Sequence, residues 1–322
     1  MRTSYFILFT GLSLCIASSL YSWGFWAHKK ANQVAVFTLP YEMLPFYKSW
    51  VNYVSEHAVD ADKRRFVSES EAPRHYIDLD HYGTFPFDSF PHKYDSAVAK
   101  YSADTLNAYG IVPWIIHWSY YSLVKAFKEN DQKRILRISA DLGHYVADAH
   151  VPLHTTENYN GQLTGQVGIH GLWESRLPEL FGDNYDYFAG KARYIEDPLE
   201  AAWGAVLESH RALDSVLGFE RQLNEEFPPD QKYSFEQRGA RIIKVYSREY
   251  SEAYHKRLDG MVERRLRKAI VAIGSYWYTA WVDAGQPDLN ELSNPDYEPE
   301  VDPKFEEDSL HDHDGRWLGR PE

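Results

Sequence analysis

The sequence contains very little cysteine, and its body has no apolar run long enough to cross a membrane. Among 322 residues there is one cysteine, Cys15, so an intramolecular disulfide is excluded and thiolate metal sites are not expected. Basic residues are also outnumbered. The 34 lysines and arginines stand against 47 acids, and the net charge of −13 disfavours electrostatic wrapping of duplex nucleic acid. Histidine is abundant, with 14 residues, and this balance favours imidazole–carboxylate metal chemistry.

The two ends of the chain differ in composition from the body. Residues 1–22 combine Arg2 with an apolar stretch shorter than the ~20 residues of a membrane span, which predicts a secretory signal cleaved before Trp23. A membrane anchor is the alternative. Residues 287–322 contain five prolines and twelve acids against three basic residues, which predicts a disordered acidic tail. We therefore expect a secreted or periplasmic protein with no transmembrane segment in the mature chain and no evident stable protein partner.

The body, residues 23–286, shows helical periodicity and almost no strand alternation. Helical patterns cover residues 27–39, 131–151, 198–223 and 238–285. Pro40 and Pro152 follow the first two patterns, and a break in the last is expected near Asp259 and Gly260. The sequence predicts one all-α helical-bundle domain.

Histidines and a carboxylate recur at helical spacing in residues 144–154, HYVADAHVPLH. His144 and Asp148 are four residues apart, so both side chains leave the same face of a helix. After the helix ends, His154 can turn back toward that face. Imidazole with carboxylate at this spacing suits zinc. Taken alone, the pattern could also be an ordinary polar helix face.

Other candidate ligands lie before and after this segment. His170 and Glu174 repeat the four-residue spacing, and this second pair favours a metal site over a solvated face. His75 lies in an acid-rich segment, and Asp60 and Asp62 precede three basic residues. Each of these three is a weak signal alone, because loop histidines and aspartates are usually solvated.

The predicted mature N-terminus adds a different kind of ligand. If Trp23 begins the mature chain, its free amine and its carbonyl can chelate one metal ion. His28 follows five residues later on the first expected helix. A histidine so close to a predicted cleavage point is consistent with a third metal site.

Together these residues resemble the superfamily of zinc-dependent phospholipases C and single-strand-specific nucleases of the S1/P1 type, which are helical bundles carrying three zinc ions. The signature of that superfamily is found over His144, Tyr145, Ala147, Asp148, Pro152, His154 and Asn158. It departs from the family at Ala147, where glycine or threonine is usual. The resemblance extends over roughly residues 23–285.

The resemblance implies a trinuclear zinc centre. One zinc would be bound by Asp60, His75, His144 and Asp148, a second by His154, His170 and Glu174, and a third by Trp23, His28 and Asp148. Asp148 would then bridge two ions, because a carboxylate has two oxygens to share.

The resemblance also implies hydrolysis of phosphoric esters by metal-activated water. Asp60 and Lys63 would be the catalytic residues, and Lys63, Arg64 and Asn158 would contact substrate. Glu174 is typical of the phospholipase branch, so we expect a phospholipase C-like hydrolase acting on phospholipid. Two alternatives stay open, a nuclease acting on single-stranded nucleic acid or 3′-nucleotides and a zinc-binding protein without catalysis. Loop aromatics such as Phe85 would serve a lipid or a nucleic-acid substrate.

Overall fold

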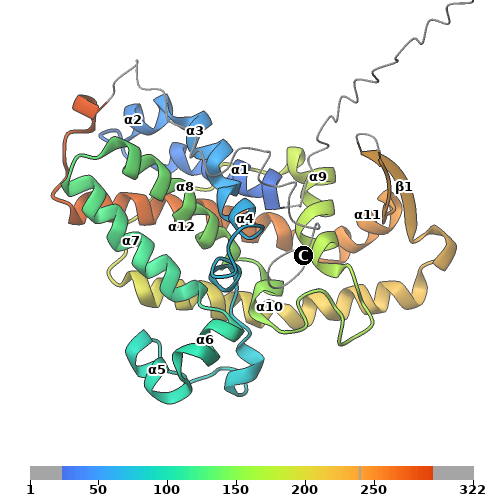
Figure 1. Cartoon of the computed structure of the whole chain (residues 1–322). Helices are drawn as coiled ribbons and strands as arrows, with labels where there is room; N and C mark the ends of the chain where they lie inside the picture. Colours follow the sequence, from blue (N-terminus) through green and yellow to red (C-terminus); the bar gives the residue numbers. More distant parts are fainter. Residues whose placement is uncertain (1–23, 239–240, 293–322) are drawn as a thin grey trace, which may run out of the picture.

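A computed structural model describes residues 24–238 and 241–292, and the chain is mostly helical there (Figure 1). The expected signal segment 1–22, Trp23 and residues 293–322 of the expected tail lie outside the described residues. The α-helices are α1 Gly24–Ala35, α2 Leu44–Ser49, α3 Val51–Glu56, α4 Asp60–Arg64, α5 Tyr94–Tyr101, α6 Ala103–Tyr109, α7 Val112–Lys128, α8 Gln132–Asp148, α9 Leu177–Phe181, α10 Pro198–Glu226, α11 Arg248–Arg257 and α12 Met261–Asp283. Among these helices, none has the length and apolar character needed to cross a bilayer.

The main core is formed by α1, α7, α8, α12 and the first part of α10. Trp277 of α12 is fully buried, and its indole Nε1 donates to the carbonyl of Ser139 on α8 at 3.0 Å. The ring of Tyr47 stacks on Trp277 at 5.0 Å. Buried aromatic groups that also satisfy their polar atoms fix the rotation of α8 and α12 about their axes.

Helices α1 and α8 approach closely at Gly143. A Cβ atom at this position would lie 2.0 Å from Oδ1 of Asn32, so only glycine fits. The amide of Asn32 donates to the carbonyls of Val54 and Ala140 at 3.0 and 3.1 Å. Since His28 lies one turn before Asn32, and His144 follows Gly143, this contact brings the two histidines together.

A second apolar cluster joins α9, α11 and the second part of α10. Tyr250 and Tyr254 of α11 are fully buried, and their hydroxyls donate to Glu220 and to the carbonyl of Val216 on α10. This cluster supports the segment 169–177, which carries part of the candidate site.

The helical pattern expected over residues 238–285 is wrong in its first part. Residues Tyr233–Arg238 and Arg241–Tyr246 form an antiparallel hairpin, β1–β2 (Figure 1). β-branched and aromatic residues in this stretch favour strand over helix. The expected break near Asp259 is confirmed, because Asp259 and Gly260 have positive φ of 48° and 70° between α11 and α12.

The packed body also continues past residue 286, the end expected from the sequence. Leu289 is buried in the main core, and Nε1 of Trp281 donates to the carbonyl of Pro287 at 2.9 Å. Apolar side chains within the acidic, proline-containing segment therefore add to the fold.

Candidate metal centre

Histidine and carboxylate side chains from distant parts of the chain come together in three buried groups. In each group, one donor atom from every residue lies within 4.8 Å of the others. The groups are His28, His144 and Asp148; Asp62, His75 and His144; and His154, His170 and Glu174. With Trp23 outside the described residues, every candidate ligand from the sequence belongs to one of these groups except Asp60.

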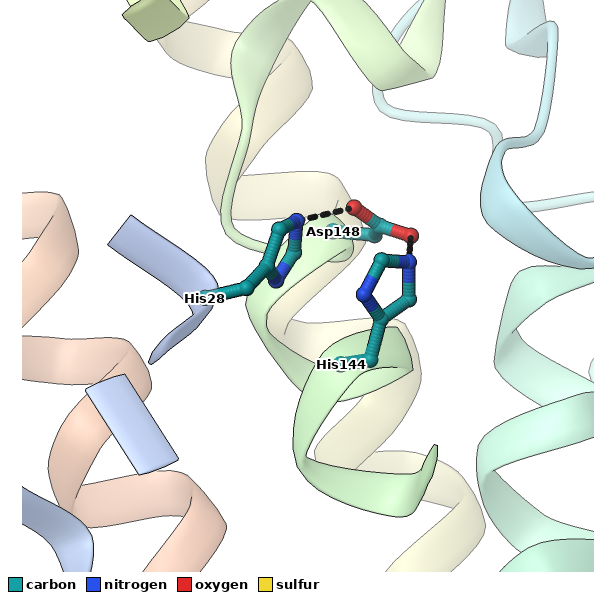
Figure 2. Close-up of side chains that lie close together, drawn as sticks. All are labelled: His28, His144 and Asp148. Carbon is teal, nitrogen blue, oxygen red and sulfur yellow. Dashed lines mark ion pairs between the residues drawn. The ribbon is translucent and has the colours of Figure 1, made fainter. Parts of the chain in front are cut away.

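Asp148 lies between two of the groups, and its two oxygens face different histidines. Oδ2 lies 3.1 Å from Nε2 of His144 and 3.0 Å from Nδ1 of His75. Oδ1 lies 3.3 Å from Nε2 of His28 (Figure 2). One carboxylate can therefore contribute to two adjacent cation sites.

Helix α8 places His144 and Asp148 on the same face. Its N-terminus is capped by Asp131, whose side chain accepts from the backbone N–H of Arg134 at 3.0 Å. The helix ends at Asp148. A short 3₁₀ turn over Pro152–Thr155 follows, and it places His154 close to Asp148 again, with Nδ1 of His154 at 3.5 Å from Oδ1 of Asp148. The expected helix ending before Pro152 is confirmed.

Backbone carbonyls fix the orientation of two imidazole rings. Nδ1 of His144 donates to the carbonyl of Ala58 at 2.8 Å, and Nδ1 of His154 donates to the carbonyl of His75 at 2.8 Å. A carbonyl oxygen only accepts, so the neutral rings carry their lone pairs on Nε2. Metal-binding histidines are commonly oriented in this way.

The close approach of His144 and Asp148 requires a positive charge between these two side chains. Nε2 of a neutral His144 would set its lone pair against a carboxylate oxygen of Asp148, and two acceptors repel each other unless a proton or a metal ion lies between them. Burial lowers the pKa of His144, but Asp148 and Asp62 outweigh burial and raise it to about 10. Nδ1 of His28 also has no hydrogen-bond partner among the described residues. The donor set therefore fits a cation.

The group of His154, His170 and Glu174 has the dimensions of a small tetrahedral site. Nε2 of His154 lies 3.1 Å from Nε2 of His170 and 3.1 Å from Oε2 of Glu174, and His170 lies 2.6 Å from the same oxygen. Ligands of a tetrahedral zinc ion are about 3.3 Å apart. Burial raises the pKa of Glu174, but His170 and His154 outweigh burial and hold the carboxyl well below its usual range. Glu174 is therefore charged at neutral pH.

Glu174 belongs to a π-helical turn, Gly171–Arg176, with His170 directly before it. π-helical turns are rare in proteins, and those that do occur are often found at functional sites. A cavity of about 40 Å³, lined in part by His28, Glu174 and Trp173, adjoins the donor groups. This volume is sufficient for an ion or a water molecule.

The expectation that Asp60 belongs to the centre does not agree with the structure. The carboxylate of Asp60 is partly exposed and contacts Nδ1 of His57 at 2.5 Å and Nζ of Lys63 at 3.0 Å. Asp62 is buried, and its Oδ1 lies 3.7 Å from His75 and 3.6 Å from His144. Residues two apart on a helix point roughly 200° apart, so only one of the two aspartates can face the centre.

The three expected substrate contacts are engaged within the protein. Lys63 pairs with Asp60. Arg64 donates to Asp141 at 3.0 Å and to the hydroxyl of Tyr145 at 3.1 Å, within an ion network that also includes Glu71. Asn158 stabilises its own loop, accepting from the N–H of Leu163 at 2.8 Å and donating to Thr164 at 3.1 Å. The contacts of Asn158 are thus those of a residue that caps its own loop.

The ligand set that the resemblance implies takes Asp60, whereas the structure brings Asp62 to the histidines; sequence reasoning missed Glu71, which is buried beside His75. Glu71 accepts from the hydroxyl of Tyr145 and lies 3.7 Å from Nε2 of His75. Burial raises its pKa, but His75 and Arg64 outweigh burial and hold the carboxyl well below its usual range. A signal was present, because Glu71 and His75 show the same four-residue spacing as the other pairs.

Comparison of the chain with protein-family models and with curated proteins finds no match.

Proposed function

We propose that this protein is a zinc-dependent hydrolase of phosphoric diesters, of the phospholipase C type. The observation that carries the proposal is the position of Asp148, whose two oxygens face His28 on one side and His75 and His144 on the other. Bound zinc ions would supply Lewis-acid charge and a water molecule of lowered pKa. Zinc rather than a hard cation is favoured because imidazole nitrogens dominate the donor set.

The charge balance of the centre favours an anionic substrate. Asp62, Asp148 and Glu174 contribute three negative charges, and the other described donors are imidazoles, which are neutral when they bind a metal ion. Three divalent ions would leave an excess of positive charge in a buried site, where electrostatic attraction is strong. A phosphodiester carries the negative charge that compensates this excess.

The protein's own residues would orient the centre and hold it in place. The carbonyls of Ala58 and His75 fix the rings of His144 and His154, so that Nε2 of each ring is directed at the donor groups. Gly143 and Asn32 hold the two central helices at a fixed distance. A rigid set of donors loses little energy in reorganisation during the reaction.

A second candidate function, a nuclease for single strands, is favoured by one observation. Phe85 is 42% exposed, its ring is stacked with His210, and the guanidinium of Arg211 lies 5.4 Å from the ring centroid. Nδ1 of His210 donates to the carbonyl of Thr155, the residue after His154. An exposed aromatic ring beside a cation can stack a nucleic-acid base.

The test is hydrolysis by zinc-loaded protein of a chromogenic phosphodiester, followed by phosphatidylcholine, single-stranded DNA, RNA and 3′-nucleotides side by side. We expect turnover that is lost in Glu174→Gln and retained in the matched control Glu179→Gln, which lies outside the donor groups. Preference for phosphatidylcholine would support the phospholipase, and preference for single strands would support the nuclease. Zinc binding without turnover of any substrate would refute the proposal in favour of a non-catalytic zinc protein.

A further inference from the structure

The β1–β2 hairpin carries two large apolar side chains in solvent. Phe235 and Ile242 are each 74% exposed. Phe235 is paired with Lys244, and Ile242 is paired with Gln237. Directly opposed residues, and residues two apart on one strand, share a face of a sheet. Phe235 and Ile242 therefore lie as neighbours on the same face.

The base of the hairpin is attached firmly to the body. Arg176 donates to both carboxylate oxygens of Glu236, and its Nε donates to the carbonyl of Tyr246 at 3.1 Å. Lys232 contacts the buried Glu220 at 3.0 Å. From this base the strands extend at the edge of the molecule beside α11 (Figure 1). The exposed apolar pair is thus carried on a fixed, projecting element.

The hairpin segment is basic, although the whole chain is acidic. Residues 232–248 contain five basic residues and one acid, in a protein of net charge −13. Lys232 and Glu236 are engaged by Glu220 and Arg176 in the body. The other basic residues of the segment are Arg238, Arg241, Lys244 and Arg248.

We propose that the hairpin attaches the protein to membrane surfaces rich in anionic lipid. Phe235 and Ile242 enter the boundary between headgroups and acyl chains, and the net positive charge of the segment attracts the lipid phosphates. The charge of the segment is complementary to such a surface. Two protruding side chains offer far less area than the roughly 1,200 Å² of a stable protein interface, whereas a lipid surface needs no matching shape. This inference uses no metal-binding residue and is independent of the proposed hydrolase activity.

The test is cosedimentation of the full-length, zinc-loaded mature protein with vesicles at low temperature. One set contains phosphatidylglycerol and phosphatidylcholine, the other phosphatidylcholine alone, and the lipid phosphorus is checked to remain in the vesicles. We expect binding to the anionic set that weakens as salt is raised. The double variant Phe235→Ser, Ile242→Ser should partition at least about tenfold more weakly.

Phe188→Ser provides the matched control, because Phe188 is 90% exposed on another part of the surface. It should bind vesicles as the unaltered protein does, and all variants should keep the same unfolding temperature. Lys244→Glu reverses one charge on the face that carries Phe235, and it also removes the contact of Nζ with the ring of Tyr233; it should weaken binding to the anionic vesicles.

Failure of the unaltered protein to bind anionic vesicles would overturn the inference. So would equal binding by the double variant, or an equal loss in Phe188→Ser. If the double variant binds vesicles as the unaltered protein does and differs only in the mass of its assembly in solution, the hairpin contacts another protein chain. The lipid proposal would then be wrong.

Discussion

Replacing Asp62 and Asp60 one at a time by asparagine gives the most direct test of the metal centre. The two residues are two positions apart on α4, and both substitutions remove one charge with almost no change of shape. The structure places Asp62 beside His75 and His144, and Asp60 beside His57 and Lys63. We expect Asp62→Asn to lose metal and Asp60→Asn to retain it.

The expected change in zinc affinity differs between the two variants, because Asp62 and Asp60 lie in different surroundings. Loss of a group that merely supports a metal ligand costs about 10–100-fold in affinity, so loss of a charged ligand should cost at least about 100-fold. A change of that size corresponds to about 2.7 kcal/mol. Asp60 makes partly exposed contacts, of a kind worth less than about 1 kcal/mol to stability. Its replacement should leave zinc affinity unchanged within a factor of about two.

The assay is equilibrium dialysis of each variant against a series of zinc–chelator buffers, with bound zinc measured by atomic emission. Unfolding temperatures of the metal-free variants serve as the control for folding. Loss of zinc from Asp60→Asn together with full retention by Asp62→Asn would refute the reasoning, and would favour the ligand set that the family resemblance implies.

Three other predictions concern the bridge, the N-terminus and acid stability. Asp148→Asn should release more zinc per chain than His154→Ala, because its two oxygens face different histidines, His28 and His75, and equal release would argue against a bridge. A chain that begins at Trp23 should bind more zinc than one with two added N-terminal residues, and equal zinc content would exclude the amine as a ligand. Burial and Arg265 lower the pKa of His150 to about 3, so the unfolded chain binds the extra proton and stability falls as pH drops from about 6.5 toward 3. The urea midpoint of His150→Gln should therefore fall less between pH 7 and 4 than that of the unaltered protein, and parallel profiles would show that His150 is not a cause of acid sensitivity.

Much of the helical framework and of the donor set could be read from the amino-acid order. His144 with Asp148 and His170 with Glu174 are local pairs, and a spacing of four residues is meaningful wherever the chain forms a helical turn. The ends of α8 follow from Asp131 and from the proline after it, since capping and the missing N–H of proline act within a few residues. Helical content was predicted for the same reason, because apolar periodicity is a local property.

Other features depend on contacts between distant segments. The choice between Asp60 and Asp62 depends on which face of α4 meets α8, and that is decided by packing. The basic run after Asp62 looks like a substrate contact in sequence, but Arg64 pairs with Asp141, 77 positions away. The strand Arg241–Tyr246 lies within the stretch that the sequence predicts to be helical, because a short apolar run is ambiguous until a partner strand provides its hydrogen bonds.

The sequence alone thus determined which residue types could form a metal centre, because ligand chemistry and local spacing belong to the chain itself. Only the tertiary structure decided which of those residues meet. His28 and Asp148 are far apart in the chain, and their separation of 3.3 Å depends on the close approach of α1 and α8 at Gly143 and Asn32. That approach is a property of two packed helices, and no local pattern encodes it.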